Sequence, residues 1–267
     1  MKYLVILGDG MADRPMESLG GQTPLEYANT PMMDELASKG ETGMVHTIPD
    51  GMKPGSDTAN LSVLGYDPRR FYSGRSPLEA LSIGVPMKDT DIALRCNLVT
   101  LSEEEHDYAG RTIIDHSSGE ISTEESTILL EAVRRELETE RFHFYAGTSY
   151  RHCLIWEGGE VTDLVAPHDV LGQKTGDHLP ENEQLRAMME KSYEILVDHP
   201  VNTERRRRGL NPANSCWFWG AGTKPALYPF EERTHKKGAM ISAVDLLKGI
   251  AVGTSMKVIT VEGANGG

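Results

Sequence analysis

Two oxygen-bearing side chains lie where the chain passes from one element to the next. Asp9 directly follows the apolar run 3–7 inside a Gly-Asp-Gly turn, and Ser56 follows a Pro-Gly pair at the start of a helical pattern. A carboxylate fixed by such a turn could ligate a divalent cation, and a hydroxyl at a helix N-terminus could attack a phosphoryl group. By spacing alone, the plainer interpretations are favoured: an Asp that stabilises its own turn and a Ser that caps its helix.

Arginines in unusual local contexts are candidates for binding an anion. They are Arg75, Arg95, Arg151 and Arg207 or Arg208. The planar guanidinium binds carboxylate and phosphate bidentately, so several of them together would suit a small, doubly anionic ligand. Sequence does not show whether they converge, and a scattered arginine is normally a surface residue. The run 205–208 is better explained as a solvated helix end that places cations near the negative end of the helix dipole.

Two histidines stand beside carboxylates, in Asp115-His116 and His168-Asp169. Such pairs could act as general acids or metal ligands. Neither has the i, i+4 spacing of a helical zinc site, and pairs of this kind are more often hydrogen-bonding groups of loops. We therefore interpret both as loop residues.

The elements that must position these residues follow an α/β pattern at the start of the chain. The apolar runs 3–7 and 43–48 predict buried strands. Residues 30–40 predict a short helix, with Thr at the N-cap, Pro at the first helical position and Gly just past the end. Residues 56–64 predict another helix. Strand, helix, strand and helix in this order favour a parallel sheet.

From about residue 88 to 178 the pattern changes to short strands around one helix, which predicts an inserted α+β domain. The strands are predicted at 93–101, 111–114, 142–145 and 152–157, and the helix at 122–138. A second helix is predicted at 183–197. The α/β pattern then returns, with strands at 215–220, 237–242 and 257–262 and a helix at 243–249.

Composition excludes several classes of protein. The 267 residues include 40 acidic and 27 basic side chains, for a formal charge of −13, which argues against a nucleic-acid partner. No apolar run approaches the roughly 20 residues that span a bilayer, and the N-terminus lacks the pattern of a signal peptide. Three widely separated cysteines predict neither a zinc cluster nor a disulfide framework. We therefore expect a cytoplasmic protein without a membrane partner; its oligomeric state is not predicted.

Several long strings together carry a family resemblance. They are YLVILGDGMAD (3–13), PGSDTANLSVLGYDP (54–68), GRSPLEA (74–80), RCNLVT (95–100), YRH (150–152), NPAN (211–214), WG (219–220) and SAVDLLKGI (242–250). The chain resembles the archaeal-type 2,3-bisphosphoglycerate-independent phosphoglycerate mutases of the alkaline phosphatase superfamily. The resemblance implies an α/β, alkaline-phosphatase-like three-layer core with a mostly parallel sheet, interrupted by a smaller α+β inserted domain. The core would comprise residues 1–87 and 183–267, and the inserted substrate domain residues 88–182.

The resemblance also implies an activity: interconversion of 3-phosphoglycerate and 2-phosphoglycerate through a phosphoserine intermediate in glycolysis and gluconeogenesis. Ser56 would be the serine that is phosphorylated, and Lys237 would approach the phosphoserine. Asp9 and Ser56 would ligate two divalent metal ions, manganese first, with magnesium, cobalt or zinc as alternatives. The partner would be a small phosphorylated carboxylic acid, bound by a set of residues in family-like strings: Arg75, Arg95, Asn97, Arg151 and His152.

One departure from the family is visible at the C-terminus. Similar mutases carry their remaining Asp and His metal ligands beyond the string that here ends the chain, so we expect a missing C-terminal segment, weak metal binding and little turnover. Two alternatives follow. One is a related phosphotransferase, because close relatives have been labelled as proposed homoserine kinases or phosphonopyruvate decarboxylases. The other is a catalytically inactive fragment of the same family.

Overall fold

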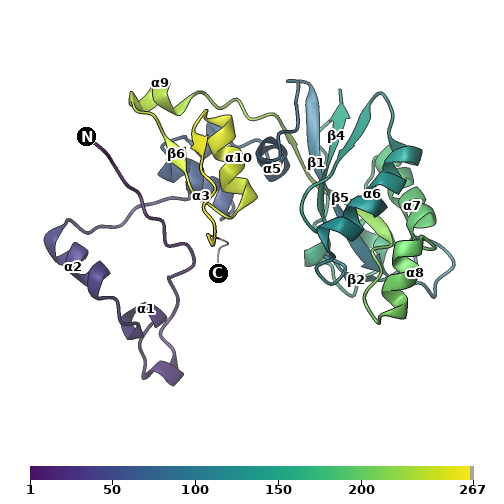
Figure 1. Cartoon of the computed structure of the whole chain (residues 1–267), viewed down its shortest axis with the longest axis horizontal. Helices are drawn as coiled ribbons and strands as arrows, with labels where there is room; N and C mark the ends of the chain where they lie inside the picture. The colour runs from purple at the N-terminus through teal and green to yellow at the C-terminus, as the bar shows by residue number, and fades with distance from the viewer. Residues whose placement is uncertain (265–267) are drawn as a thin grey trace. The chain divides into compact units, whose positions relative to one another are not determined.

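The computed structural model describes residues 1–264 and divides into two units, residues 1–46 and the chain from Thr47 onward (Figure 1). The first unit holds three short helices, η1 (Glu17–Leu19), α1 (Pro24–Tyr27) and α2 (Pro31–Lys39). Thr30 and Gly40 flank α2, as the sequence predicted. Local signals were sufficient here because capping and a proline at the first position act within one turn of helix.

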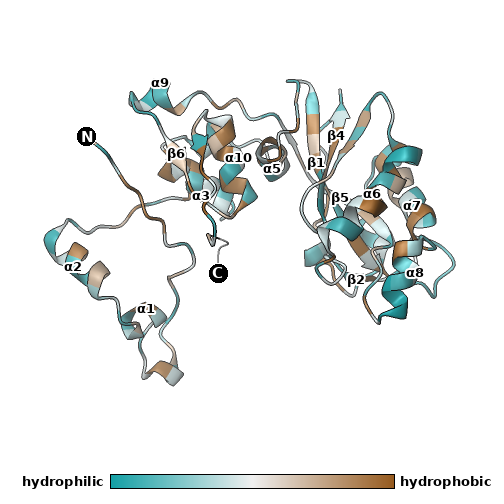
Figure 2. Cartoon of the chain, in the orientation of Figure 1, coloured by the Kyte–Doolittle hydropathy of each residue, from teal (hydrophilic) through white to brown (hydrophobic). Residues whose placement is uncertain are grey.

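The strands predicted at 3–7 and 43–48 are not formed. These residues have no regular secondary structure, and their apolar side chains other than the half-buried Ile48 are exposed, with Leu4 85% and Ile6 83% accessible. Figure 2 shows the brown apolar run beside the N-terminus. A strand needs a hydrogen-bonded neighbour, and within residues 1–46 the only ladder contact is the isolated bridge between Met16 and Gln22.

The second unit contains a five-stranded sheet built around one long strand. Its strands are β1 (Asp91–Leu101), β2 (Ile113–Asp115), β3 (Phe142–Tyr145), β4 (Arg151–Glu157) and β5 (Ser215–Thr223). β1 pairs with β2, β4 and β5, and β3 pairs with β4, in every case antiparallel.

The mostly parallel sheet was predicted for the core, whereas β1 to β4 of this antiparallel sheet lie in the segment 88–182 that was predicted as the inserted α+β domain. Among the described residues, the one parallel ladder joins β6 (Ala239–Met240) to β7 (Lys257–Val258). The other strands predicted for the parallel sheet at the start of the chain, 3–7 and 43–48, are the two that are not formed. β5 was expected in the second part of the core, but it lies in the same sheet as the strands of the middle segment.

One face of the sheet carries the main apolar core. Alternate residues of β1, Ile92, Leu94, Cys96 and Leu98, are buried in a cluster with residues from α6 (Thr123–Leu137) and α7 (Glu183–Leu196). Figure 1 shows both helices, with α8 (Pro200–Arg207), on this side. The predicted helices and strands of the middle segment are confirmed within a few residues at each end.

A group of helices packs on the opposite side of the sheet and reaches it through α5. α3 (Ser56–Val63), α4 (Pro68–Phe71), α5 (Arg75–Ser82) and α10 (Asp245–Gly253) share a second apolar cluster. α5 also contacts β1 and β5, with Ala80 in a third cluster beside Ala93. The remaining elements are α9 (Phe230–Thr234), η2 (Pro167–Asp169) and η3 (Thr175–His178).

Two glycine contacts fix the place of α5. Gly74, at the N-cap with φ 119°, approaches β5 so closely that a Cβ there would lie 2.9 Å from the Gly222 Cα. On the other side, a Cβ at Gly249 of α10 would lie 1.7 Å from the backbone oxygen of Leu78. α5 is therefore held tightly between β5 and α10.

We expected the arginine run at the end of α8 to be a solvated helix end. In the structure it is partly buried. Arg205 is 3% exposed, forms an ion pair with Glu125 of α6, and donates to the backbone oxygens of Ser118 and Asn211. Arg208 also pairs with Glu125, at 3.1 Å. The run therefore ties α8 to the segment around α6.

Within residues 1–264 there is no helix long and apolar enough to cross a bilayer.

Candidate functional site

A cavity of about 450 Å³ lies between α5, the start of α10 and the sheet face opposite the main core. Its lining includes all five residues predicted to bind substrate: Arg75, Arg95, Asn97, Arg151 and His152. They come from α5, β1 and β4. The cavity therefore brings together arginines that are far apart in the sequence: Arg75 and Arg151 are separated by 76 positions.

Strand alternation places two of these side chains. Arg95 and Asn97 are odd-numbered residues of β1, and their even-numbered neighbours face the main core. The antiparallel register sets Arg95 opposite Cys153 and Trp219, and Asn97 opposite Arg151. One short stretch of β1 thus organises side chains from three strands.

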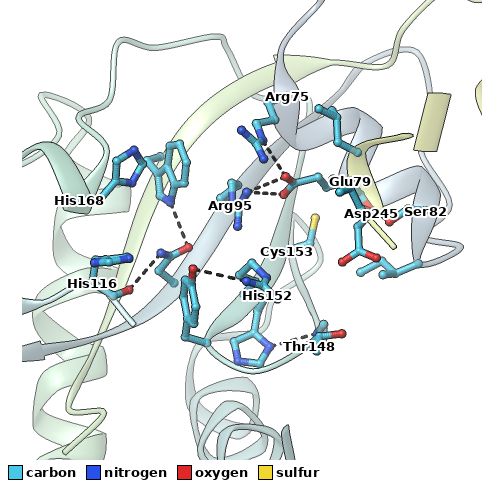
Figure 3. A pocket seen from close by; sticks show the side chains of 18 of the residues that line it. Arg75, Glu79, Ser82, Arg95, His116, Thr148, His152, Cys153, His168 and Asp245 are labelled. Carbon is cyan, nitrogen blue, oxygen red and sulfur yellow. Dashed lines mark hydrogen bonds and ion pairs between the residues drawn. The ribbon is translucent and has the colours of Figure 1, made fainter. Parts of the chain in front are cut away.

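Arg75 and Arg95 share one carboxylate, that of Glu79 (Figure 3). Arg75 Nε donates to Glu79 Oε1 at 2.8 Å, and Arg95 Nη1 lies 2.6 Å from the same carboxylate. Arg75 and Glu79 are one turn apart on α5, whereas Arg95 reaches them from β1. Side-chain exposure falls from 44% for Arg75 to 19% for Glu79 and 7% for Arg95.

Two neighbours, the Glu79 carboxylate and the Trp219 ring, stabilise the buried guanidinium of Arg95. Burial lowers the pKa of its guanidinium, and the negative charge of Glu79 opposes that shift. The guanidinium also lies over the Trp219 ring, 4.8 Å from the ring centre. Its Nε is buried without a hydrogen-bond partner among the described residues. Arg95 is therefore a fixed positive charge deep in the cavity wall.

Asn97 connects the strand to the histidine side of the cavity. Its Oδ1 accepts from Trp219 Nε1 at 3.1 Å, and its Nδ2 donates to the backbone oxygen of His116 at 3.2 Å. The rings of His116, His168 and Trp219 follow one another edge to face, with centroids 5.9 Å and 5.2 Å apart. This chain of rings gives the cavity a wall that is aromatic yet able to donate hydrogen bonds.

Arg151 and His152, at the start of β4, are held differently. Arg151 lies over the Tyr150 ring, 5.0 Å from its centre, and donates to the Tyr150 hydroxyl at 3.4 Å. His152 is 4% exposed and its Nδ1 accepts from the Gly147 backbone N–H at 3.1 Å. Burial lowers the pKa of His152 to about 4, so the ring is neutral near pH 7 and carries its proton on Nε2.

Sequence reasoning missed Glu79 and Trp219 and discounted two histidines. His116 and His168, which we interpreted as loop residues, both line the cavity. The i, i+4 spacing of Arg75 and Glu79 was a visible signal, but that pattern is also common on exposed helix faces. Trp219 lies in the middle of β5, and its orientation toward the cavity depends on the pairing with Arg95 of β1.

The structure does not place the remaining predicted residues in this cavity. Ser56 is the first residue of α3 and is exposed; the N-cap is Gly55, so Ser56 is not a simple helix cap. Lys237 is exposed just before β6. Asp9 is exposed in a turn of the first unit. None of the three is among the lining residues.

The described residues do not fit a complete divalent-metal site. Over residues 1–264 no group of three or more His, Cys, Asp or Glu side chains is arranged to hold a metal ion. Asp9 and the Ser56 hydroxyl could each supply one oxygen ligand, whereas a two-metal site needs several ligands per ion. We therefore derive no chemical step through a metal.

Comparison with known proteins gives consistent matches. Residues 37–202 match the family model of 2,3-bisphosphoglycerate-independent phosphoglycerate mutase. The enzyme of that name from Methanosarcina barkeri is 51% identical over 100% of this chain and 66% of its own length. The phosphoglycerate mutase 2 of the same kind from Methanothermobacter thermautotrophicus is 46% identical over 100% of this chain and 65% of its own. The chain thus spans about two thirds of the length of these relatives.

Two solved structures resemble the chain. The PH0037 protein from Pyrococcus horikoshii has a TM-score of 0.72 at 33% identity, covering 96% of this chain and 60% of that one. The cofactor-independent phosphoglycerate mutase from Thermoplasma acidophilum has a TM-score of 0.58 at 32% identity, covering 96% of this chain and 68% of that one.

Proposed function

Since the chain belongs to the 2,3-bisphosphoglycerate-independent phosphoglycerate mutase family, we propose that it acts in the interconversion of 3-phosphoglycerate and 2-phosphoglycerate. The observation that supports this most directly is the convergence of Arg75, Arg95 and Arg151 on one cavity of an acidic protein. Three guanidiniums suit a ligand that carries both a phosphate and a carboxylate.

In this proposal the cavity residues bind and orient phosphoglycerate. Arg75, Arg95 and Arg151 neutralise its anionic groups, and the neutral His152 donates a hydrogen bond from Nε2, which has no partner among the described residues. The amide of Asn97 is held between Trp219 and His116, so its orientation is fixed before the ligand arrives. Such preorganisation lowers the entropic cost of orienting the glycerate.

Chemistry is assigned to Ser56 and Lys237. The Ser56 hydroxyl oxygen forms a bond to phosphorus while the bond from phosphorus to the 3-oxygen of the substrate breaks, and the serine proton passes to the departing oxygen. After the glycerate reorients, its 2-hydroxyl takes the phosphoryl group back and Ser56 regains its proton. The Lys237 ammonium stabilises charge on the group in transfer. The Asp9 carboxylate and the Ser56 hydroxyl would each supply one oxygen ligand to a divalent metal ion.

We also propose the corresponding division of the fold. The antiparallel sheet with α6 and α7 forms the substrate domain, and α3, α5 and α10 with the β6–β7 ladder belong to an alkaline-phosphatase-like core. The parallel pairing of β6 with β7 supports this assignment, because parallel strands joined by a helix such as α10 are the repeating unit of a core of that kind.

The test is a phosphoserine assay combined with ligand binding. The chain, incubated with 3-phosphoglycerate, is expected to gain one phosphoryl group on Ser56, detected by mass spectrometry of its peptides. Ser56→Ala should abolish the label, whereas Ser62→Ala on the same helix should retain it. Calorimetry should show tighter binding of 3-phosphoglycerate than of homoserine or ATP. Binding of homoserine with ATP in its place would favour the kinase alternative and overturn this assignment.

A further inference from the structure

The cavity contains a carboxylate where an anionic ligand is expected to bind. Glu79 is among the lining residues, and both Arg75 and Arg95 contact its carboxylate (Figure 3). Of the charged side chains that line the cavity, the three arginines face two carboxylates, Glu79 and Asp245. The Asp245 carboxylate is already 3.3 Å from Lys248 on α10. Glu79 is therefore the carboxylate that directly offsets the positive charge of the arginines.

We propose that Glu79 is a built-in counter-ion which an entering anion displaces from Arg75 and Arg95, and which limits how tightly the cavity holds its ligand. This inference rests on the proposed function, since it takes a phosphorylated carboxylic acid as the ligand. It makes Glu79 a positioning residue that sets affinity, without a part in bond formation.

The contacts of Arg75 and Arg95 indicate which of the two side chains moves when a ligand enters. Arg95 is buried, stacked over Trp219 and fixed by its strand, so it stays in place when a ligand enters. Arg75 has almost half of its side chain exposed and is held by a single carboxylate contact from its own helix. An anion that binds both guanidiniums would take over the Glu79 contacts, and Arg75 would turn from Glu79 to the ligand.

The counter-ion role of Glu79 predicts how the change in affinity should depend on the charge of the ligand. The Glu79 charge lowers the positive potential in the cavity, and the energy that a ligand loses as a result is proportional to its own charge. Removing the charge should therefore strengthen binding of phosphoglycerate most, inorganic phosphate less and glycerate least. A residue that merely supports the fold would weaken all three together.

Weaker ground-state binding has a use in a reversible isomerase. Substrate and product carry the same charges, so a cavity with an uncompensated arginine pair would hold both tightly without lowering the barrier between them. A competing carboxylate keeps release fast. It also keeps two neighbouring guanidiniums from repelling each other when the cavity holds no ligand.

The experiment compares Glu79→Gln with Glu157→Gln in the 267-residue chain. Glu157 pairs with Lys88 at 2.8 Å and is not among the lining residues, so its substitution changes the net charge equally. Calorimetry is performed with 3-phosphoglycerate, inorganic phosphate and glycerate. For Glu79→Gln we expect Kd for 3-phosphoglycerate to fall about tenfold and that for glycerate about twofold or less, with a steeper loss of affinity as salt is raised. Glu157→Gln should match the wild type.

A second measurement uses the wild-type chain, so it does not depend on how the variant folds. The side-chain carboxyl carbon of Glu79 should change its NMR chemical shift on saturation with inorganic phosphate, and that of Glu157 should not. Unchanged or uniformly weaker binding by a folded Glu79→Gln chain, or an unmoved Glu79 signal at saturation, would overturn the counter-ion role and leave the mutase proposal standing. A gain in affinity that grows with ligand charge, in a chain whose wild type binds 3-phosphoglycerate no more tightly than inorganic phosphate, would support the counter-ion and count against the mutase.

Discussion

At the scale of single residues, the neutral, buried His152 makes the stability of the protein depend on pH. An unfolded histidine takes up a proton near pH 6.5, whereas His152 in the fold does so only at about 4. Between these values the unfolded state binds more protons, so the free energy of unfolding falls as the pH falls. With about 1.4 kcal/mol for each pKa unit, the loss from pH 7 to pH 5 is about 2 kcal/mol, and it is complete below about pH 4.

The substitution His152→Asn tests this dependence. The Asn Oδ1 can accept the Gly147 N–H as Nδ1 does, but the side chain does not titrate. Urea unfolding at pH 7 and pH 5 should show a loss of stability about 2 kcal/mol smaller than in the wild type. The exposed His106, replaced by Asn, is the control and should leave the loss unchanged. An equal loss in wild type and His152→Asn would contradict a neutral buried ring.

The candidate binding residues could be identified from the sequence, but which of them contact one another in the cavity could not. Arg75, Arg95 and Arg151 stood out by local context, and all three line the cavity. Glu79 has the same type and spacing as many exposed helix residues. What distinguishes it is Arg95, which arrives from another element through the packing of α5 on β1. A side chain whose role depends on a partner distant in the sequence has no local signature.

At the scale of elements, the contact between α5 and α10 determines whether the cavity forms, because both helices line it. Gly249→Ala would place a methyl group against the backbone oxygen of Leu78, which cannot turn aside as a side chain does. We expect a loss of about 2 kcal/mol or more in the free energy of unfolding, measured by urea titration, with weaker binding of 3-phosphoglycerate.

The control for this substitution lies on the same helix. A methyl group at Gly253 would meet Leu227 Cδ1 and Leu81 Cδ1, which are the flexible ends of side chains. Gly253→Ala should therefore cost less than Gly249→Ala. If the two variants were equally stable, the close approach of α10 to α5 would not limit the size of the residue at position 249.

Elements with local signals were predicted well. Thr30, Pro31 and Gly40 determined the bounds of α2, and apolar spacing located α6 and α7. The place of β5 in the sheet was predicted less well, because the order of strands and helices was the only guide to it. β1 pairs with β4 of the middle segment and with β5 of the end segment, and no short sequence pattern indicates the second partner.

At the scale of the whole molecule, apolar burial is unequal between the two units. Residues 1–46 contain no residue classed as buried, whereas the main cluster and its two neighbours all lie in the second unit. Stability measured by unfolding should therefore come almost entirely from the second unit, since the free energy of burial scales with the apolar area removed from water.

Matched isoleucine substitutions test this distribution. Ile6 is 83% exposed and Ile113 is fully buried in the main core. Ile113→Ala should lower the free energy of unfolding by about 2–5 kcal/mol, and Ile6→Ala by less than about 0.5 kcal/mol, both measured in urea. Comparable losses would show that the run 3–7 is packed in solution. The burial of residues 3–7 was predicted from their apolar composition alone. Composition does not show whether a neighbouring strand is available to pair with them.

The position of β1 at the centre of the sheet also has a consequence for synthesis. Asn97 and Trp219, which meet through a hydrogen bond in the cavity, are 122 residues apart in the chain. At about 5–20 residues per second, a ribosome that has finished β1 needs on the order of ten seconds more to produce β5. Throughout that interval one edge of β1 has no partner, so the nascent chain should depend on chaperones until the last strand of the sheet arrives.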